Sequence, residues 1–295
     1  MSVGSVPVES AAALEVGQAD VRRREFLHDL VRHKSFWAGV IIIGFWVLAA
    51  IFGALVVKDP NAQNLLNINQ APSGAYWFGT DQLGRDMFAR VITGSRDILI
   101  IAVLATLLGT VVGTVLGLFM GYFRGAVDDV LGRVVEAFLA LPLVIVGILG
   151  TIALGGASTG SLIVIIGIVF TPLIARTVRA AVLVERDLDY VPAARLRGEN
   201  SLHIMFVEIL PNIMPPVVVE FTVRLSYAVF TLVALSFLGF GVQPPSSDWG
   251  LDISNNYGQL PAGYWWEVLF DALAIATLVI GVNMLSTSIE SALEG

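Results

Sequence analysis

Residues 185–211 read ERDLDYVPAARLRGENSLHIMFVEILP, a long polar-rich segment in an otherwise hydrophobic chain. We expect a short helix to begin near Pro192, because proline suits the first helical turn, where its missing N–H would have no partner. That helix should end at Gly198, since glycine readily adopts the left-handed conformation that follows a helix. A second helix, capped by Asn200 or Ser201, should end before the next proline. The segment is therefore predicted to fold as helix, glycine turn and helix.

This segment resembles the EAA loop of permease subunits of ABC importers, in which Glu-Ala-Ala is followed by a glycine and then by a hydrophobic stretch ending in Leu-Pro. The alanines, the glycine and the final Leu-Pro stand at the family's spacing, whereas proline replaces its glutamate. The resemblance implies a coupling helix in a cleft of a separate ATPase, where small alanines keep the leading face narrow. The residues assigned to this contact are Asp189, Pro192, Ala193, Ala194, Arg195, Gly198, Leu210 and Pro211. An ordinary cytosolic loop is the alternative interpretation.

The composition is that of a membrane protein. Of 295 residues, 56% are hydrophobic and only 14% are charged, and the mean hydropathy is +0.80, which excludes an ordinary soluble domain. The chain has no cysteine, so it offers neither a disulfide nor a thiolate metal site. Its three histidines lie apart in the sequence, and no metal site is predicted.

The distribution of charge predicts an all-α integral membrane protein with six transmembrane helices. We expect a cytoplasmic tail with an interfacial helix over residues 1–35 and a first span over residues 36–57, which are free of charge. Residues 58–97 should form an external loop. The core permease domain (residues 98–290) should hold the other five spans and the coupling loop 185–214, and residues 291–295 form the C-terminal end. The expected core spans are residues 98–123, 134–154, 161–184, 215–241 and 268–289, with kinks at Pro142 and Pro172.

The external loop carries a second resemblance. Asp81 precedes Arg85 by four residues and Asp86 precedes Arg90 by four, which favours helical ion pairs and predicts a lateral amphipathic helix. The block from residue 78 to residue 96 resembles the signature that precedes the second span in C-type permeases of dipeptide and oligopeptide importers. Residues 236–250 resemble another signature of these peptide permeases, although Leu232 stands where that family often has a glutamate.

The second span carries glycines at intervals of four residues. Glycines one turn apart leave a flat stripe that lets another helix approach closely, so we interpret them as packing residues rather than as a chemical site. They are Gly109, Gly113, Gly117 and Gly121.

The fifth span contains an ionisable pair, Glu220 and Arg224, four residues apart. Charged residues within a span are costly and indicate function by default. An interfacial pair near the cytosolic end is the favoured interpretation here, because both residues lie soon after Pro216. The candidate pathway or gate residues are Glu220, Arg224, Phe237 and Gly239.

Six spans place both termini on one side of the membrane. Twelve of the 17 lysines and arginines lie in the N-terminal tail, in the loop after the second span and in residues 176–197. The positive-inside rule makes these regions cytoplasmic. The coupling loop is then expected to face the cytosol, on the same side as ATP.

The chain lacks the Gly-x-x-x-x-Gly-Lys-Ser/Thr phosphate loop, so we expect no enzyme activity and no cofactor bound by this chain. The resemblance implies the permease subunit of an importer of the dipeptide, oligopeptide and nickel type, in a bacterial or archaeal cell membrane. Its implied partners are a second related permease, two ATPase subunits that bind ATP and Mg²⁺, an external solute-binding protein and the lipid bilayer, with no nucleic acid. Peptides are the favoured solute. Alternatives are the import of nickel or another small solute, a secondary transporter and, last, a membrane enzyme.

Overall fold

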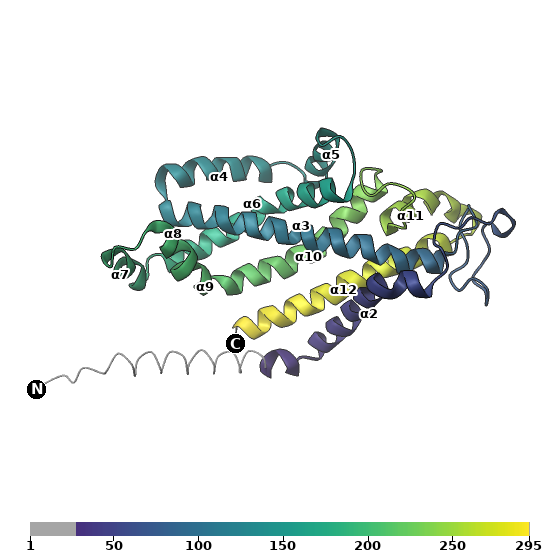
Figure 1. The fold of residues 1–295 in the computed structure, drawn as a ribbon, viewed down its shortest axis with the longest axis horizontal. Helices are drawn as coiled ribbons and strands as arrows, with labels where there is room; N and C mark the ends of the chain where they lie inside the picture. The colour runs from purple at the N-terminus through teal and green to yellow at the C-terminus, as the bar shows by residue number, and fades with distance from the viewer. Residues whose placement is uncertain (1–27, 295) are drawn as a thin grey trace, which may run out of the picture.

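The computed structural model describes residues 28–294 as a bundle of long helices (Figure 1). Within these residues, five helices are long and apolar enough to cross a membrane, and the bent pair α4–α5 makes a sixth crossing if it is counted as one span. The five long helices are α2 (Lys34–Val56), α3 (Met87–Phe123), α6 (Thr159–Glu185), α10 (Met214–Phe237) and α12 (Trp266–Glu294). The all-helical membrane fold is thus confirmed. Most of the expected N-terminal tail lies outside the described residues.

Shorter helices lie between the long ones. Three of them are η1 (Leu65–Asn67), α11 (Trp249–Asn256) and η3 (Tyr257–Ala262). The bent pair consists of α4 (Gly125–Leu139) and α5 (Leu143–Ala153). Between α6 and α10 the chain forms α7 (Tyr190–Leu196), α8 (Ser201–His203), the π-helical segment η2 (Ile204–Ile209) and α9 (Leu210–Asn212).

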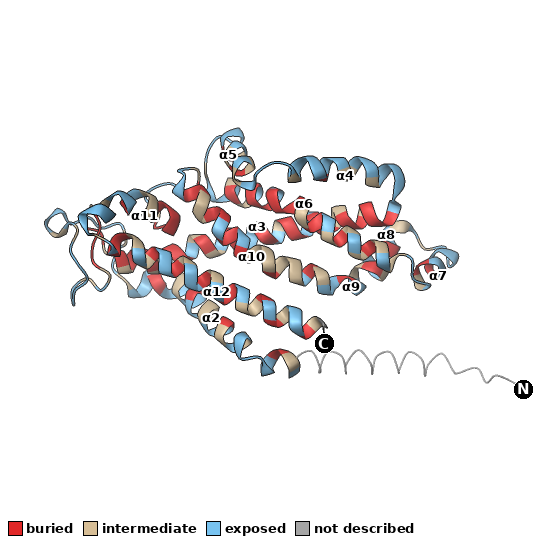
Figure 2. Ribbon diagram, turned by 180° about the vertical axis from the view of Figure 1, so that it is seen from behind, coloured by how far each residue is buried: buried red, intermediate tan, exposed pale blue. Residues whose placement is uncertain are grey.

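The closest helix packing in the core joins α3 to α6. A Cβ atom added at Gly117 would lie 2.6 Å from Cβ of Val178, and one at Gly121 would lie 2.6 Å from Cβ of Val182. Only glycine permits this approach of the two backbones, so the stripe acts in packing as predicted. Buried side chains line the inner faces of α3, α6 and α10, whereas α4 and α5 are exposed over most of their surface (Figure 2).

The predicted lateral amphipathic helix is wrong, because α3 begins at Met87 and runs without interruption into the membrane. Asp86 caps this helix by accepting a hydrogen bond from the N–H of Phe88 at 3.0 Å, so its carboxylate does not pair with the arginine four residues later. The ion pair between Asp81 and Arg85 does form, with 2.6 Å between Oδ2 and Nε. It lies in the loop before the helix and stabilises a turn.

Arg90 instead joins α3 to α11. Its fully buried guanidinium group donates hydrogen bonds to both carboxylate oxygens of Asp252 in α11 and to the carbonyl oxygen of Ser246. Beside it, the buried indole of Trp249 donates to the carbonyl oxygen of Val91 at 2.9 Å. These bonds fix α11 against the outer end of α3.

The third span was expected over residues 134–154 with a kink at Pro142, and the chain there is bent by 97° between α4 and α5. Pro142 stands at the N-cap of α5, where it has no N–H to continue the preceding helix, so the predicted kink is a complete break. Pro172 lies inside α6 without interrupting it. The fifth span also ends earlier than expected, at Phe237, because the following segment turns at Gly239.

Candidate coupling site

The segment between α6 and α10 lies at one end of the bundle, and α11 lies at the opposite end (Figure 1). The predicted glycine turn is confirmed, since Gly198 has φ +84° directly after α7. Asn200 caps the next helix, with its Oδ1 accepting from the N–H of His203 at 2.7 Å. The first helix begins at Tyr190, two residues before Pro192, which still lies within its first turn.

The second helix does not end before Pro211, as had been expected. It continues through η2 into α9, and Pro211 lies in the first turn of α9. In the π-helical segment the backbone hydrogen bonds span five residues instead of four. Proline is tolerated in the first turn of the following α9, because the N–H that it lacks would have no partner there. Pro211 is exposed and Leu210 is half-buried.

The predicted contact residues do not all share one face of α7. Pro192, Ala193 and Arg195 are exposed, but Ala194 is fully buried and packs against the protein. Ala194 is therefore not part of the leading face, since the helical period turns it inward together with Val191, three residues earlier. Asp189 is exposed just before the helix.

Leu196 is the residue that the sequence analysis missed. Its side chain is 91% exposed at the end of α7, three residues after exposed Ala193 and four after exposed Pro192. The helical spacing from Pro192 would have placed it on the same face. These three residues form a small apolar surface, which we call the α7 tip.

Polar contacts hold the base of α7. The hydroxyl group of Tyr190 donates to Oε1 of Glu185 at 3.0 Å, and burial raises the pKa of Tyr190 to about 12. The guanidinium group of Arg195 lies over the ring of Tyr122, 5.0 Å from its centroid. Tyr122 belongs to the last turn of α3, so α7 is attached to two of the long helices.

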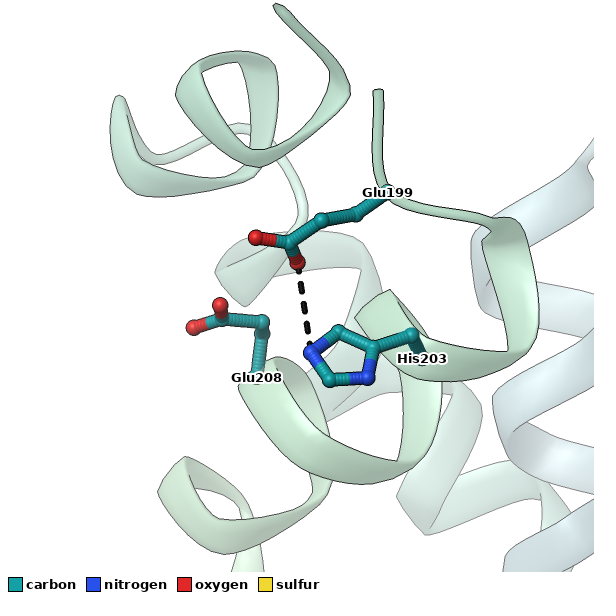
Figure 3. A group of neighbouring side chains, drawn as sticks. All are labelled: Glu199, His203 and Glu208. Atoms are coloured by element: carbon teal, nitrogen blue, oxygen red, sulfur yellow. Dashed lines mark ion pairs between the residues drawn. The ribbon is translucent and has the colours of Figure 1, made fainter. Parts of the chain in front are cut away.

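Two acids and a histidine gather behind the glycine turn (Figure 3). His203 Nε2 lies 3.4 Å from Oε2 of Glu199. Arg197 bridges both acids, with its Nε donating to Oε1 of Glu199 at 2.8 Å and its Nη2 to Oε1 of Glu208 at 3.0 Å. The arginine thus offsets part of the charge of the two acids, and we interpret the group as a brace for the turn rather than as a metal site.

The four candidate pathway residues do not meet. Glu220 and Arg224 form an ion pair with 2.8 Å between Oε2 and Nε, and Thr177 of α6 donates to the other oxygen of Glu220 at 2.7 Å. Phe237 and Gly239 lie at the other end of α10, about 25 Å away at 1.5 Å of rise per residue. The half-buried pair links α10 to α6, as suits an interfacial ion pair.

Comparisons with known proteins identify the family. Residues 113–294 match the model of the binding-protein-dependent transport system inner membrane component, and this match spans more than half of the chain. The chain belongs to this family. Residues 22–72 of the permease also match the N-terminal transmembrane domain of oligopeptide transport permease C.

Curated relatives of the permease include dipeptide transport system permease proteins. The protein of Escherichia coli (strain K12) is 37% identical over 278 residues, which cover 92% of each chain. That of Alkalihalophilus pseudofirmus is 35% identical over 272 residues, covering 92% of this chain and 89% of the relative. Among solved structures, an inward-facing conformation of the MetNI methionine ABC transporter matches with a TM-score of 0.58 at 20% identity. That match covers 70% of this chain and 97% of the other, and it supports the type I importer fold.

Proposed function

We propose that the permease forms half of the translocation pathway of an ATP-driven peptide importer and that the α7 tip contacts an ATPase subunit. The other half would come from a second, related permease. Two ATPase subunits would bind ATP and Mg²⁺, and an external solute-binding protein would deliver the peptide. ATP hydrolysis would therefore take place on the partners and not on this chain. The names of the relatives support peptides over nickel or another small solute.

The α7 tip is the observation that carries this proposal. Leu196, which is 91% exposed, shares one exposed apolar face with Pro192 and Ala193 on a short helix between two membrane helices, and this position supports a contact with a partner. A short helix with a narrow apolar end can enter a cleft without displacing the helices behind it. Because α7 directly follows α6 and precedes α10, a movement of the tip would reach both membrane helices.

The proposed orientation places the α7 tip in the cytosol of the cell. Arginines cluster in residues 176–197, and the positive-inside rule assigns such a segment to the cytoplasmic side. The start of α2 and the end of α12 lie toward the same end of the bundle as α7 (Figure 1). Both termini are then cytoplasmic, and the solute-binding protein meets the opposite end, which carries α11.

Leu196→Asp tests the ATPase contact. Burying a leucine side chain stabilises an interface by about 1.5–3 kcal/mol, so the charged variant should bind the ATPase subunits at least about tenfold more weakly. ATP-driven peptide uptake should fall with it. Binding is measured as co-purification and affinity of the ATPase for the permease in nanodiscs, and uptake is measured in proteoliposomes.

Leu66→Asp is the matched control, because Leu66 is also 91% exposed but lies in the external loop. This variant should retain ATPase binding. The proposal would be refuted by undiminished ATPase binding of Leu196→Asp, or by peptide uptake that continues without the ATPase subunits. ATP-driven uptake of nickel but not of peptides would favour the alternative solute.

A further inference from the structure

The corner where α6 turns into α7 is joined to the junction of α3 and α4 by side-chain contacts. Arg124, at the junction, donates to Oδ2 of Asp187 at 2.8 Å, just beyond the end of α6. Arg186 lies over the ring of Tyr122 at 5.9 Å from its centroid, on the ring that Arg195 of α7 also contacts. A displacement of α7 therefore acts on the cytosolic ends of α3 and α6 together.

A stronger contact links α6 to α4. Arg179, six residues before the end of α6, donates from Nε and Nη2 to the two carboxylate oxygens of Asp128, both at 2.5 Å. Asp128 lies in the first turn of α4, and its side chain is only 14% exposed. By contrast, the side chains of Arg124 and Asp187 are 42% and 63% exposed, so their ion pair contributes little. The two parallel hydrogen bonds of Arg179 therefore give the contact between α6 and α4 a fixed geometry.

The rest of α4 is loosely packed. Val135 is buried against Met120 and Ala175, while the other described residues of α4 are half-buried or exposed. A cavity of about 420 Å³ lies beside the ion pair, lined by residues of α3, α4 and α6 that include Asp129 and Arg176. Since a densely packed interface would resist movement, this space leaves α4 free to shift with its charged contact.

Movement of α4 can reach the end of α10 and the beginning of α6 through α5. After the 97° bend, α5 packs against α10 and α6: a Cβ atom added at Gly147 would lie 3.0 Å from Cδ2 of Leu235, and one at Gly150 would lie 3.1 Å from Cγ1 of Ile165. The lever formed by α4 and α5 thus begins at Asp128 and ends against the last turn of α10 and the second turn of α6.

We propose that Asp128 and Arg179 are positioning residues that transmit the displacement of α7 to the bent pair α4–α5. This inference rests on the proposed function of the permease, because the displacement is supplied by the ATPase subunits. The ion pair keeps α4 in register with the end of α6, so α5 moves against α10 when α6 moves. Without the ion pair, α6 and α7 should still move with the ATPase, but the bent pair α4–α5 should no longer move with α6.

The test uses the complete transporter in proteoliposomes and measures peptide taken up per ATP hydrolysed. Asp128→Asn and Arg179→Gln should each lower this ratio about fivefold, at the lower end of the range of allosteric coupling. Cross-linking of a cysteine at Leu196 to the ATPase should be unchanged in both variants. A purely structural role would instead reduce assembly and cross-linking together.

A double-mutant cycle tests whether Asp128 and Arg179 act as one unit or independently of each other. If the pair acts as a unit, the double variant should also lose about fivefold, whereas independent effects would multiply to about 25-fold. Lys58→Gln is the control, because the exposed Lys58 forms a long ion pair of 3.8 Å with Asp86, away from α4 and α7, and its loss should leave the ratio unchanged.

Two outcomes would overturn the inference: a normal ratio in Asp128→Asn, or multiplying losses in the double variant. If the neutral variants do not assemble, Arg179→Lys replaces them, since it keeps the charge but loses the two-pronged contact. A normal ratio in that variant would also overturn the inference, and a lowered one supports it. Failure of the unaltered transporter to import peptides would instead refute the proposed function.

Discussion

Gly117→Ala is predicted to force α3 and α6 apart. The added methyl carbon would lie 2.6 Å from Cβ of Val178 and 2.8 Å from the carbonyl oxygen of Ala175, whereas ordinary contact begins at 3.4 Å. The shortfall is about 0.8 Å. Neither neighbour can avoid the methyl group by changing rotamer, because one atom is backbone and the other is attached directly to it. The two helices must therefore separate along the glycine stripe.

Overpacking of this kind costs about 1–3 kcal/mol, and the better helix propensity of alanine offsets up to about 1 kcal/mol of it. We expect a net loss of about 1–2 kcal/mol. Gly44→Ala is the control, since Gly44 lies within α2 and a Cβ atom there meets nothing within 4 Å. Thermal unfolding of both variants is followed by tryptophan fluorescence in one detergent. The packing argument is refuted if Gly117→Ala unfolds at the same temperature as Gly44→Ala or above it.

Two further predictions concern the end of the bundle that carries α11. Burial raises the pKa of Asp248 to about 7, so below that pH the folded state holds a proton that the unfolded state has released, and stability rises as pH falls from about 8 to about 5. Asp248→Asn can still accept the hydrogen bond from Leu251 N–H. This variant should be more stable at a pH of about 8, and its thermal midpoint should vary less with pH across this range. An unchanged slope of the midpoint against pH would contradict the assignment. Arg90→Ala should cost about 3–5 kcal/mol, because it leaves the buried carboxylate of Asp252 without its partner. Lys58→Gln removes an exposed lysine from a 3.8 Å pair and should cost about 0–1 kcal/mol in the same unfolding assay; equal costs for the two variants would show that burial of the cation is unimportant.

Local patterns predicted the parts of the molecule that depend on local physics. Long charge-free segments became membrane helices, since a helix satisfies its own backbone hydrogen bonds within the bilayer. Gly198 adopts the left-handed turn for which glycine is suited, and the glycine stripe packs against a neighbouring helix. Each of these depends on residue type and short spacing.

The predicted ion pair of Arg90 was wrong because this side chain had two available partners. Arg90 stands four residues after Asp86, which is correct spacing for a helical ion pair, yet it binds Asp252 from the other end of the chain. Burial decides which carboxylate Arg90 binds. Asp86 already accepts hydrogen bonds as the helix cap, and the fully buried Arg90 pairs with the equally buried carboxylate of Asp252. A distant partner of this kind leaves no local signal.

The sequence by itself determined that this chain enters a membrane, that the segment between α6 and α10 is helix, turn and helix, and which helix face can approach another closely. Only the tertiary structure decided that Ala194 is buried and Leu196 exposed, that the third span bends by 97°, and that Asp128 reaches Arg179. The physical reason is that hydrophobicity and backbone conformation are properties of single residues and short segments. Exposure, bending and ion pairing depend instead on which distant surfaces the folded helices bring together.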